Sequence, residues 1–467
     1  MQIISSQKEY EKDLLEIARL FYPKYSSTEQ GVTIFHNHSL DEQNIINHTF
    51  TVNDENGSYT FIKKEENDAN LSTRKILQIG LYETLKNYTK RTFPWGSFVG
   101  IRPVKAVMDL IKNGTSTLGA INHIKKTYSV TEEKCEIIQD IIEMQGYQIK
   151  NNTLINLYVN IPFCVSRCSY CSFMSLQVGS SRDIINSYVN TLLYEIEKTK
   201  EFLQQKHYIV KNIYIGGGTP TSLNVEELEP ILKALSSYKV KEFTVEAGRA
   251  DTITKEKLDL FKKYNVTRIS INPQTFNDTV LKKANRNHTV KEFLEVYKMA
   301  IPYNFIVNMD LIAGLSGETL KSFKEGIKTI LELSPDNITI HTLSLKRAST
   351  LNQKQEDIFK TSLAEKMLKY AYEEFKKAEY KPYYLYRQKN MLDNLENIGF
   401  CKNKKICEFN IDSIDEYSSI LALGAGGASK RIYQEDNKKE QTFNVKSIDE
   451  YIKRIDEMLE RKAKLFS

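Results

Sequence analysis

The stretch CVSRCSYC, residues Cys164–Cys171, places three of the chain's six cysteines close together. Thiolates suit zinc or iron–sulfur clusters, but a closed structural zinc site takes four ligands. No fourth Cys or His stands near the three in the sequence. Three thiolates can instead hold three corners of a four-iron cluster and leave one iron open to a small molecule. We therefore predict a [4Fe-4S] site at Cys164, Cys168 and Cys171.

These cysteines directly follow the first of several short β-branched runs that alternate with amphipathic helical segments. The predicted strands, each of which reads as buried, are Ile155–Ile161, Asn212–Ile215, Glu242–Val245, Arg268–Ile271, Phe305–Ile312 and Asn337–His341. The helices predicted between them are Asp183–Leu203, Val225–Leu235, Thr254–Tyr264, Val290–Ala300 and Leu320–Leu333. The alternation predicts an α/β fold with a parallel sheet covered by helices. Because there are fewer than eight units, we expect a partial (βα)6 barrel, with ligands at the carboxyl ends of its strands.

The flanking regions have different patterns, so three domains are predicted: an N-terminal accessory domain over 1–150, a core over 151–380 and a C-terminal region over 381–467. The first is an α+β extension with a hairpin turn at Asn56-Gly57. Its segment FPWGSFVGIRP, Phe93–Pro103, holds the only tryptophan and is typical of a packed turn. The last region predicts a small C-terminal appendage that ends in a helix near Ser447–Lys462.

Composition excludes several classes of protein. With 41% hydrophobic and 27% charged residues, the chain is neither disordered nor rich enough in apolar residues for a membrane protein. No run reaches the roughly 18 apolar residues of a membrane span, and the N-terminus is too charged for a signal peptide, so we expect a cytoplasmic protein. The net charge of +6 mixes both signs, which argues against nucleic acid as a partner. Cys135, Cys401 and Cys407 are predicted to be small buried side chains or exposed thiols, without a metal role.

A glycine-rich turn, Gly216-Gly217-Gly218-Thr219-Pro220, follows the second predicted strand. The missing side chains let backbone groups approach a ligand, and Thr219 adds a hydroxyl. Together with the Cys-x3-Cys-x2-Cys loop after strand one, this turn resembles the radical S-adenosylmethionine (SAM) superfamily. The resemblance implies a radical SAM barrel whose [4Fe-4S] cluster binds the methionine part of SAM at its open iron. An electron from the cluster would cleave the sulfonium to a 5′-deoxyadenosyl radical.

Further motifs resemble the oxygen-independent coproporphyrinogen III oxidase family. They are YVNIPFC (Tyr158–Cys164), GGGTPT (Gly216–Thr221), Val245-Glu246, Gln274, Asn285-Arg286 and DLIAGL (Asp310–Leu315). Within the family, the resemblance is strongest to the coproporphyrinogen dehydrogenase branch, whose N-terminal extension holds a segment similar to Pro94–Pro103. Later motifs of that branch are similar to EAGR (Glu246–Arg249), HTLSLKRAS (His341–Ser349) and YYLYRQKN (Tyr383–Asn390).

This resemblance implies roles for individual residues. Cys164, Cys168 and Cys171 would bind the cluster. The residues that would contact or lie along the cluster-bound SAM are Tyr158, Gly217, Gly218, Thr219, Glu246 and Ser344. The family is also known for holding a second SAM, and the residues that stand at that site are Tyr170, Gln274, Arg286 and Asp310. Asp310 suits ribose hydroxyls and Arg286 suits a carboxylate.

The implied reaction is the oxidative decarboxylation of two propionates of coproporphyrinogen III to vinyl groups, which gives protoporphyrinogen IX. The radical would take a hydrogen from a propionate β-carbon, after which carbon dioxide and one electron leave. The resemblance implies reduced flavodoxin or ferredoxin as the electron donor. The basic residues proposed to bind the propionates are Arg249, Lys346, Arg347 and Arg387.

Two alternatives stay open. Asn160 stands where the family often has His, and Tyr170 where it often has Phe; Asn cannot transfer a proton as His does. Another radical SAM reaction on a tetrapyrrole, either haem binding and transfer or anaerobic haem degradation, is therefore the first alternative. The second is a non-enzymatic iron–sulfur sensor, although a sensor needs no nucleoside pocket. His288 is expected at a helix start, and His341 is either a core residue or part of the site.

Overall fold

A computed structural model describes residues 1–22, 31–42, 45–65, 71–146, 151–173, 175–179, 182–344, 363–388, 391–433 and 438–467. The chain divides into two compact units. Unit 1 is built mainly from Met1–Gln139, with Arg387–Leu395 added, and unit 2 holds the rest of the described residues. The division into three domains at residues 150 and 380 stays a prediction.

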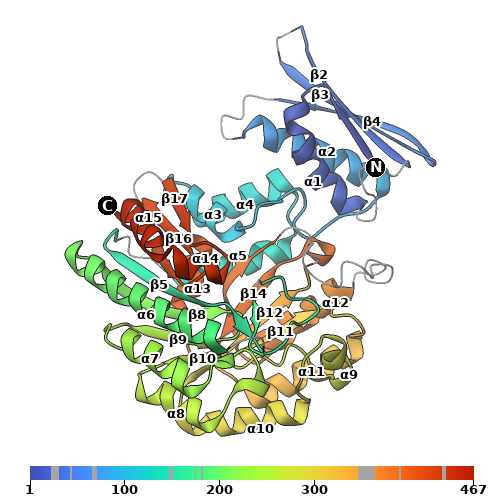
Figure 1. Cartoon of the computed structure of the whole chain (residues 1–467). Helices are drawn as coiled ribbons and strands as arrows, with labels where there is room; N and C mark the ends of the chain where they lie inside the picture. Colours follow the sequence, from blue (N-terminus) through green and yellow to red (C-terminus); the bar gives the residue numbers. More distant parts are fainter. Residues whose placement is uncertain are drawn as a thin grey trace. The chain divides into compact units, whose positions relative to one another are not determined.

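Unit 1 contains a four-stranded sheet against which α1 and α2 pack (Figure 1). Its strands are β1 (Gln2–Ser5), β2 (Val32–Leu40), β3 (Ile46–Asp54) and β4 (Gly57–Lys64), and β1 is parallel to β2 while the other pairs are antiparallel. Its helices are α1 (Glu11–Phe21), α2 (Thr73–Thr89), α3 (Pro103–Lys112), α4 (Thr117–Tyr128) and most of α5 (Glu132–Gln145). Because β4 begins at Gly57, with φ at +135°, the predicted hairpin turn is confirmed.

The segment Phe93–Pro103 is packed around Trp95, which is fully buried. The guanidinium carbon of Arg387 lies 5.3 Å from the centre of the Trp95 ring, a cation–π contact. The same side chain donates to the carbonyl oxygens of Phe98 and, at 2.9 Å, Asn394. These contacts hold the buried Arg387 inside unit 1, so they do not support the prediction that it binds a propionate.

Two buried histidines, His36 and His48, lie on the neighbouring strands β2 and β3 of unit 1. Hydrogen bonds join Ser5 Oγ to His36 Nδ1 (2.8 Å), His36 Nε2 to His48 Nδ1 (3.1 Å) and His48 Nε2 to Glu65 Oε2 (3.0 Å). Burial, and then the neighbouring His48, lower the pKa of His36 to about 4. Since the unfolded chain binds this proton near its ordinary pKa of about 6.5, neutral His36 favours the folded state above pH 6.5. That contribution is lost as the pH falls from about 6.5 toward 4.

We therefore expect unit 1 to lose about 2 kcal/mol of stability between pH 7 and pH 5, and His36→Gln to remove most of this dependence. Hydrogen exchange of the β2 and β3 amides, corrected for intrinsic rates, measures it. This readout is specific to unit 1, because burial also lowers the pKa of His288 in unit 2. His38→Gln is the matched control: His38 is exposed on the same strand, and it lowers the pKa of His36 less than burial and His48 do, so most of the pH dependence should remain. Equal pH dependence in wild type and His36→Gln would contradict the explanation.

Unit 2 is built on an 11-stranded sheet. The central strands are β5 (Leu154–Ile161), β8 (Ile209–Gly217), β9 (Glu242–Glu246), β10 (Arg268–Ser270), β11 (Ile306–Ala313) and β12 (Asn337–Thr342). They lie side by side in chain order, and every neighbouring pair is parallel. This arrangement confirms the predicted partial (βα)6 barrel.

Helices cover the outside of these strands (Figure 1). They are α6 (Arg182–Gln205), α7 (Val225–Leu235), α8 (Lys255–Lys263), α9 (Asp278–Lys283), α10 (Val290–Ala300) and α11 (Leu320–Leu333). Local sequence fixes where several begin, because Asn224, Thr289 and Thr319 each start a helix with a capping box. All five predicted helices are confirmed, including a helix start after His288, whereas α9 was not predicted.

The C-terminal region extends both edges of the same sheet. Beyond β12 lie β14 (Asn397–Cys401) and β13 (Lys381–Tyr386); beyond β5 lie β15 (Ser419–Leu423), β16 (Ala428–Tyr433) and β17 (Lys438–Phe443). Its helices are α13 (Glu408–Asp415), α14 (Ile448–Lys453) and α15 (Ile455–Phe466), and α12 (Leu363–Lys377) precedes it within the predicted core range. The predicted appendage is thus joined to the core sheet, and the predicted final helix is two helices. No helix in the part of the chain that the structure describes is long and apolar enough to cross a bilayer.

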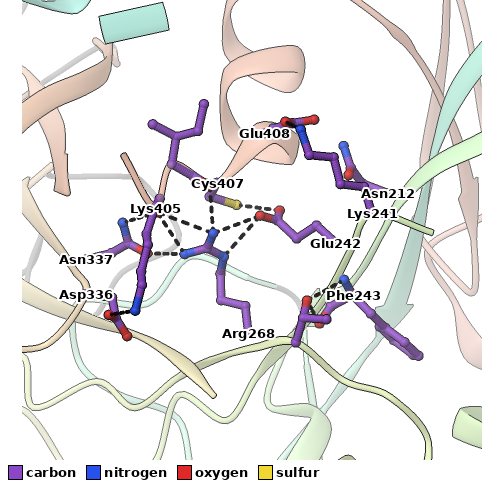
Figure 2. A network of polar contacts seen from close by, with 12 residues as sticks. Asn212, Lys241, Glu242, Phe243, Arg268, Asp336, Asn337, Lys405, Cys407 and Glu408 are labelled. Carbon is purple, nitrogen blue, oxygen red and sulfur yellow. Dashed lines mark hydrogen bonds and ion pairs between the residues drawn. The ribbon is translucent and has the colours of Figure 1, made fainter. Parts of the chain in front are cut away.

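A buried polar network lies at the amino-terminal ends of β9, β10 and β12 (Figure 2). Arg268 donates to Glu242 Oε2 at 2.8 Å, to the carbonyl oxygen of Ile406 at 2.7 Å and to Asn337 Oδ1. The Cys407 thiol donates to the other Glu242 oxygen at 3.1 Å. Cys407 is buried, as are Cys135 and Cys401, which confirms the buried alternative predicted for these three cysteines.

Candidate active site

The inner face of the six parallel strands is polar. Successive side chains of a strand point to opposite faces. One alternate set is apolar and buried, as at Ile213, Ile269 and Met309. The other set lines a cavity, and it includes Tyr214, Thr244, Ser270, Asn308 and Thr339. The strands were predicted to be buried, but this polar inner face was not predicted.

The cavity has a volume of about 350 Å³ and reaches the loops at the carboxyl ends of the strands. Of the predicted site residues, all but Tyr158 and Ser344 line it. Those that do are Cys164, Cys168, Tyr170, Cys171, Gly217, Gly218, Thr219, Glu246, Gln274, Arg286 and Asp310. The fold thus brings together residues from loops and strands that are far apart in the sequence.

The cysteine loop follows β6 (Phe163–Cys164), which pairs with β7 (Leu176–Gln177). Cys164 and Cys168 are buried, Cys171 is half-buried, and all three are free thiols. Cys164 Sγ lies 3.2 Å from Thr219 Oγ1. Burial raises the pKa of the Cys171 thiol. The loop therefore presents three soft ligands to one cavity.

The glycine-rich turn packs directly against the cysteine strand. Gly217 has φ at +112°, and a Cβ there would lie 2.2 Å from Asn160 Oδ1. A Cβ at Gly218 would lie 2.3 Å from the carbonyl oxygen of Phe163, the residue before Cys164. That oxygen also accepts a 2.7 Å hydrogen bond from the Thr219 amide. Only glycine fits this close approach, which holds the turn and the first cysteine together.

Glu246 ends β9 inside the cavity. Tyr214 donates a 2.6 Å hydrogen bond to its Oε1. Burial, and more weakly the charge of Asp310, raise the pKa of Glu246 to about 7, while the hydrogen bond from Tyr214 acts against this rise. A carboxyl group with such a pKa ionises when a cation binds beside it, so Glu246 suits an amine.

Asp310, on β11, is held by two amide side chains. Asn272 and Asn308 each donate a 2.8 Å hydrogen bond, one to each carboxylate oxygen. His341 Nε2 lies 3.5 Å from Asp310 Oδ2 and lines the cavity, so His341 is part of the site. These contacts fix Asp310 as an acceptor for a hydroxyl or an amine.

Arg286 and Gln274 carry buried polar atoms that have no hydrogen-bond partner within the described ranges: Arg286 Nε and Gln274 Oε1. The other end of Arg286 donates to the carbonyl oxygens of Gly248 at 2.9 Å and Asn272 at 2.6 Å. Gln274 has φ at +65°, which is uncommon for a residue other than glycine. Burial raises the pKa of the neighbouring Tyr170, and the charge of Arg286 opposes this rise. Unpaired buried polar atoms at a cavity are expected to meet a ligand or water.

Tyr158 and Asn160 lie on β5 and do not line the cavity. The Tyr158 ring stacks 6.2 Å from Tyr214 and 6.1 Å from Phe409, and its hydroxyl donates to Asn160 Oδ1 at 3.3 Å. Asn160 Nδ2 donates to the carbonyl oxygen of Ala425. Asn160 thus bridges β5 and the loop after β15. Ser344 lies two residues after β12 and is half-buried.

Three of the residues predicted to bind propionates, Arg249, Lys346 and Arg347, lie in the predicted core range. Arg249 is buried and forms an ion pair with Asp251 at 2.7 Å, so the structure does not support it as a propionate ligand. Lys346 and Arg347 lie outside the described residues.

Residues 158–330 match the family model described as radical SAM superfamily. The chain is 36% identical over 413 residues to the oxygen-independent coproporphyrinogen-III oxidase-like protein HemZ of Bacillus subtilis, a match that covers 85% of this chain and 82% of that protein. The chain belongs to the oxygen-independent coproporphyrinogen-III oxidase family of radical SAM proteins. This finding confirms the resemblance drawn from the motifs.

A heme chaperone and a solved coproporphyrinogen III oxidase structure are also similar to this chain. The chain is 35% identical over 192 residues to the heme chaperone HemW of Bacillus subtilis, which covers 40% of this chain and 49% of the chaperone. The structure of coproporphyrinogen III oxidase (HemN) from Escherichia coli, described as a radical SAM enzyme, matches with a TM-score of 0.52 and 21% identity. That match covers 70% of this chain and 74% of HemN, and it supports the radical SAM fold.

Radical SAM family membership implies a [4Fe-4S] cluster and SAM as cofactors. The residues present fit both groups. Three thiols at one cavity are the ligand type and number that leave one iron of such a cluster open. The unpaired atoms of Arg286 and Gln274, with the carboxyl of Glu246, offer polar partners to an amino acid and a nucleoside.

Several cavity residues were missed by the sequence analysis, notably Tyr214, Asn272, Asn308 and Thr339. A signal for them was present, because polar and apolar residues alternate in NIYI (Asn212–Ile215), RISIN (Arg268–Asn272), VNMDL (Val307–Leu311) and NITIH (Asn337–His341). Such alternation indicates a strand with one polar face.

Gly218→Ala is expected to weaken cluster uptake in this radical SAM protein. The added methyl group would displace the Phe163 carbonyl and so Cys164, at a cost of about 1–3 kcal/mol. Iron content after anaerobic reconstitution measures the effect. Gly248→Ala is the control in the same cavity, since its Cβ would lie 3.4 Å from Asn272 Nδ2, close to ordinary contact. Full iron content in Gly218→Ala would contradict the prediction.

Proposed function

We propose that this protein carries out the oxygen-independent oxidative decarboxylation of coproporphyrinogen III, converting two propionates to vinyl groups and giving protoporphyrinogen IX. The observation that carries this proposal is the 36% identity over 413 residues to a coproporphyrinogen-III oxidase-like protein. That match extends well beyond the radical SAM region of residues 158–330. The match to the heme chaperone spans only 192 residues.

In this proposal Cys164, Cys168 and Cys171 hold the cluster. The residues that contact or lie along the SAM at the cluster are Tyr158, Gly217, Gly218, Thr219, Glu246 and Ser344. A second SAM is bound by Tyr170, Gln274, Arg286 and Asp310. When bound, the cluster and SAM supply a 5′-deoxyadenosyl radical. Reduced flavodoxin or ferredoxin is proposed as the electron donor.

The chain's own residues would bind and orient these groups. Glu246 would receive the ammonium group of the methionine moiety, which would return its carboxyl to the ionised form. Asp310, with both oxygens fixed by amides, would accept hydrogen bonds from ribose hydroxyls. Arg286 would offer its unpaired Nε to a carboxylate. Positioning of the radical precursor against one C–H bond is the contribution expected of the protein.

A second candidate is a different task on a tetrapyrrole, either haem binding and transfer or anaerobic haem degradation. Two observations favour it. The radical SAM core is also similar to a heme chaperone, and Asn160, which cannot transfer a proton as His does, bridges β5 to Ala425.

An anaerobic assay separates these candidates. The reconstituted protein is incubated with dithionite, SAM and coproporphyrinogen III, and 5′-deoxyadenosine and tetrapyrroles are followed by mass spectrometry. Loss of two carboxyl groups supports the decarboxylation. Formation of 5′-deoxyadenosine without decarboxylation keeps the radical chemistry but overturns the substrate, and haem titration then tests the second candidate. A loaded cluster that never cleaves SAM would favour a sensor.

A further inference from the structure

Arg249 is a buried cation beside the cysteine loop. Its side chain is 2% exposed. Its Nε and Nη2 donate to the two carboxylate oxygens of Asp251 at 3.0 and 2.7 Å. The remaining terminal nitrogen, Nη1, lies 3.3 Å from the Ser166 carbonyl oxygen and 3.5 Å from Cys168 Sγ. In the Arg249–Asp251 ion pair, the positive group is therefore the one nearer to the Cys168 sulfur.

The local fold holds Arg249 in this orientation. It precedes a single turn of 3-10 helix, Ala250–Thr252, which places Asp251 against the guanidinium. Thr252 Oγ1 donates to the Arg249 carbonyl oxygen at 2.7 Å and also bonds Thr221 Oγ1 at 2.6 Å. Lys257 Nζ adds a 2.9 Å bond to the Thr252 carbonyl oxygen. Thr252 thus holds the backbone of Arg249, and Asp251 holds its guanidinium. The side chain therefore needs no rearrangement to stay directed at the Cys168 sulfur.

We propose that Arg249 is a positioning residue that raises the reduction potential of the cluster by directing an N–H donor and a positive charge at Cys168. The proposal rests on the proposed role of the three cysteines as cluster ligands. Uptake of one electron from an external reductant adds one negative charge to the cluster. Hydrogen bonds to the ligand sulfurs and the net charge around a cluster set its potential. Arg249 favours the reduced state, while Asp251 neutralises the far side of the guanidinium and limits the cost of burying it.

Redox titration of the full-length reconstituted protein, followed by electron paramagnetic resonance and without SAM, tests this. For Arg249→Gln we expect about tenfold less reduced cluster at a given potential, which is a midpoint about 59 mV more negative. For Arg249→Lys, which keeps the charge but loses the planar fork, we expect a smaller shift in the same direction. Arg182→Gln is the matched control, because Arg182 forms a two-bond ion pair with Glu227 on a side chain that is 53% exposed. Its midpoint should equal that of wild type.

An unchanged midpoint in cluster-loaded Arg249→Gln would overturn the proposal. Should that variant take up no cluster, Arg249→Lys decides: a lowered midpoint supports the proposal, and a wild-type midpoint overturns it. Failure of both variants to load would also overturn it, since Arg249 would then build the loop rather than tune the cluster. The titration contains no tetrapyrrole, so an error in the proposed substrate does not affect it. Failure of wild type to load would instead contradict the role of the cysteines.

Discussion

Cys168→Ala is expected to leave the protein without a stable cluster and to reduce SAM cleavage to background. Cys168 is buried and lines the same cavity as Cys164 and Cys171. With one thiolate removed, two ligands remain, and clusters of this type depend on cysteine thiolates for their attachment. Iron and sulfide content after reconstitution measures the first effect, and 5′-deoxyadenosine under dithionite measures the second.

Cys401→Ala is the matched control for that experiment. Cys401 is also a buried free thiol, but it lies in β14, paired with Asn337 at the amino-terminal end of β12. The substitution should cost roughly 1 kcal/mol in stability and leave iron content and SAM cleavage intact. Equal loss of cluster in both variants would show that stability, rather than ligation by Cys168, explains the result.

The barrel could be predicted because its signals are local. Each parallel strand is a short β-branched run, and helices begin at capping residues such as Asn224 and Thr289. The clustering of Cys164, Gly218, Glu246 and Asp310 follows from the same topology, because consecutive parallel strands bring their carboxyl ends to one edge.

Non-local pairing could not be predicted. Ser419–Leu423 is an apolar run, but nothing in it indicates that it pairs with β5 rather than forming a separate appendage. Arg249 and Arg387 were chosen as propionate ligands from residue type alone. Their roles depend on Asp251 and on Trp95, and the second of these partners comes from a remote part of the chain.

Arg268→Met is expected to destabilise unit 2 by about 3–5 kcal/mol. Arg268 and Glu242 form a buried ion pair with side chains 2% and 8% exposed. Without Arg268, the Glu242 carboxylate keeps only the Cys407 thiol as an assigned partner within the network of Figure 2. The Ile406 carbonyl oxygen also loses its 2.7 Å donor. A buried charge without a counter-ion costs far more than the pair contributes when intact.

Hydrogen exchange of amides in β9, β10 and β12 is the appropriate measurement, because these strands carry the network. The double variant Arg268→Met/Glu242→Gln removes both charges and should recover part of the lost stability, since it leaves no unpaired carboxylate. A loss of less than about 1 kcal/mol of stability in the single variant would contradict the prediction, because it would be no larger than the contribution of an ordinary surface ion pair. Loss without recovery in the double variant would show that the bonds of Arg268 to Asn337 and Ile406, rather than its charge, stabilise this end of the barrel.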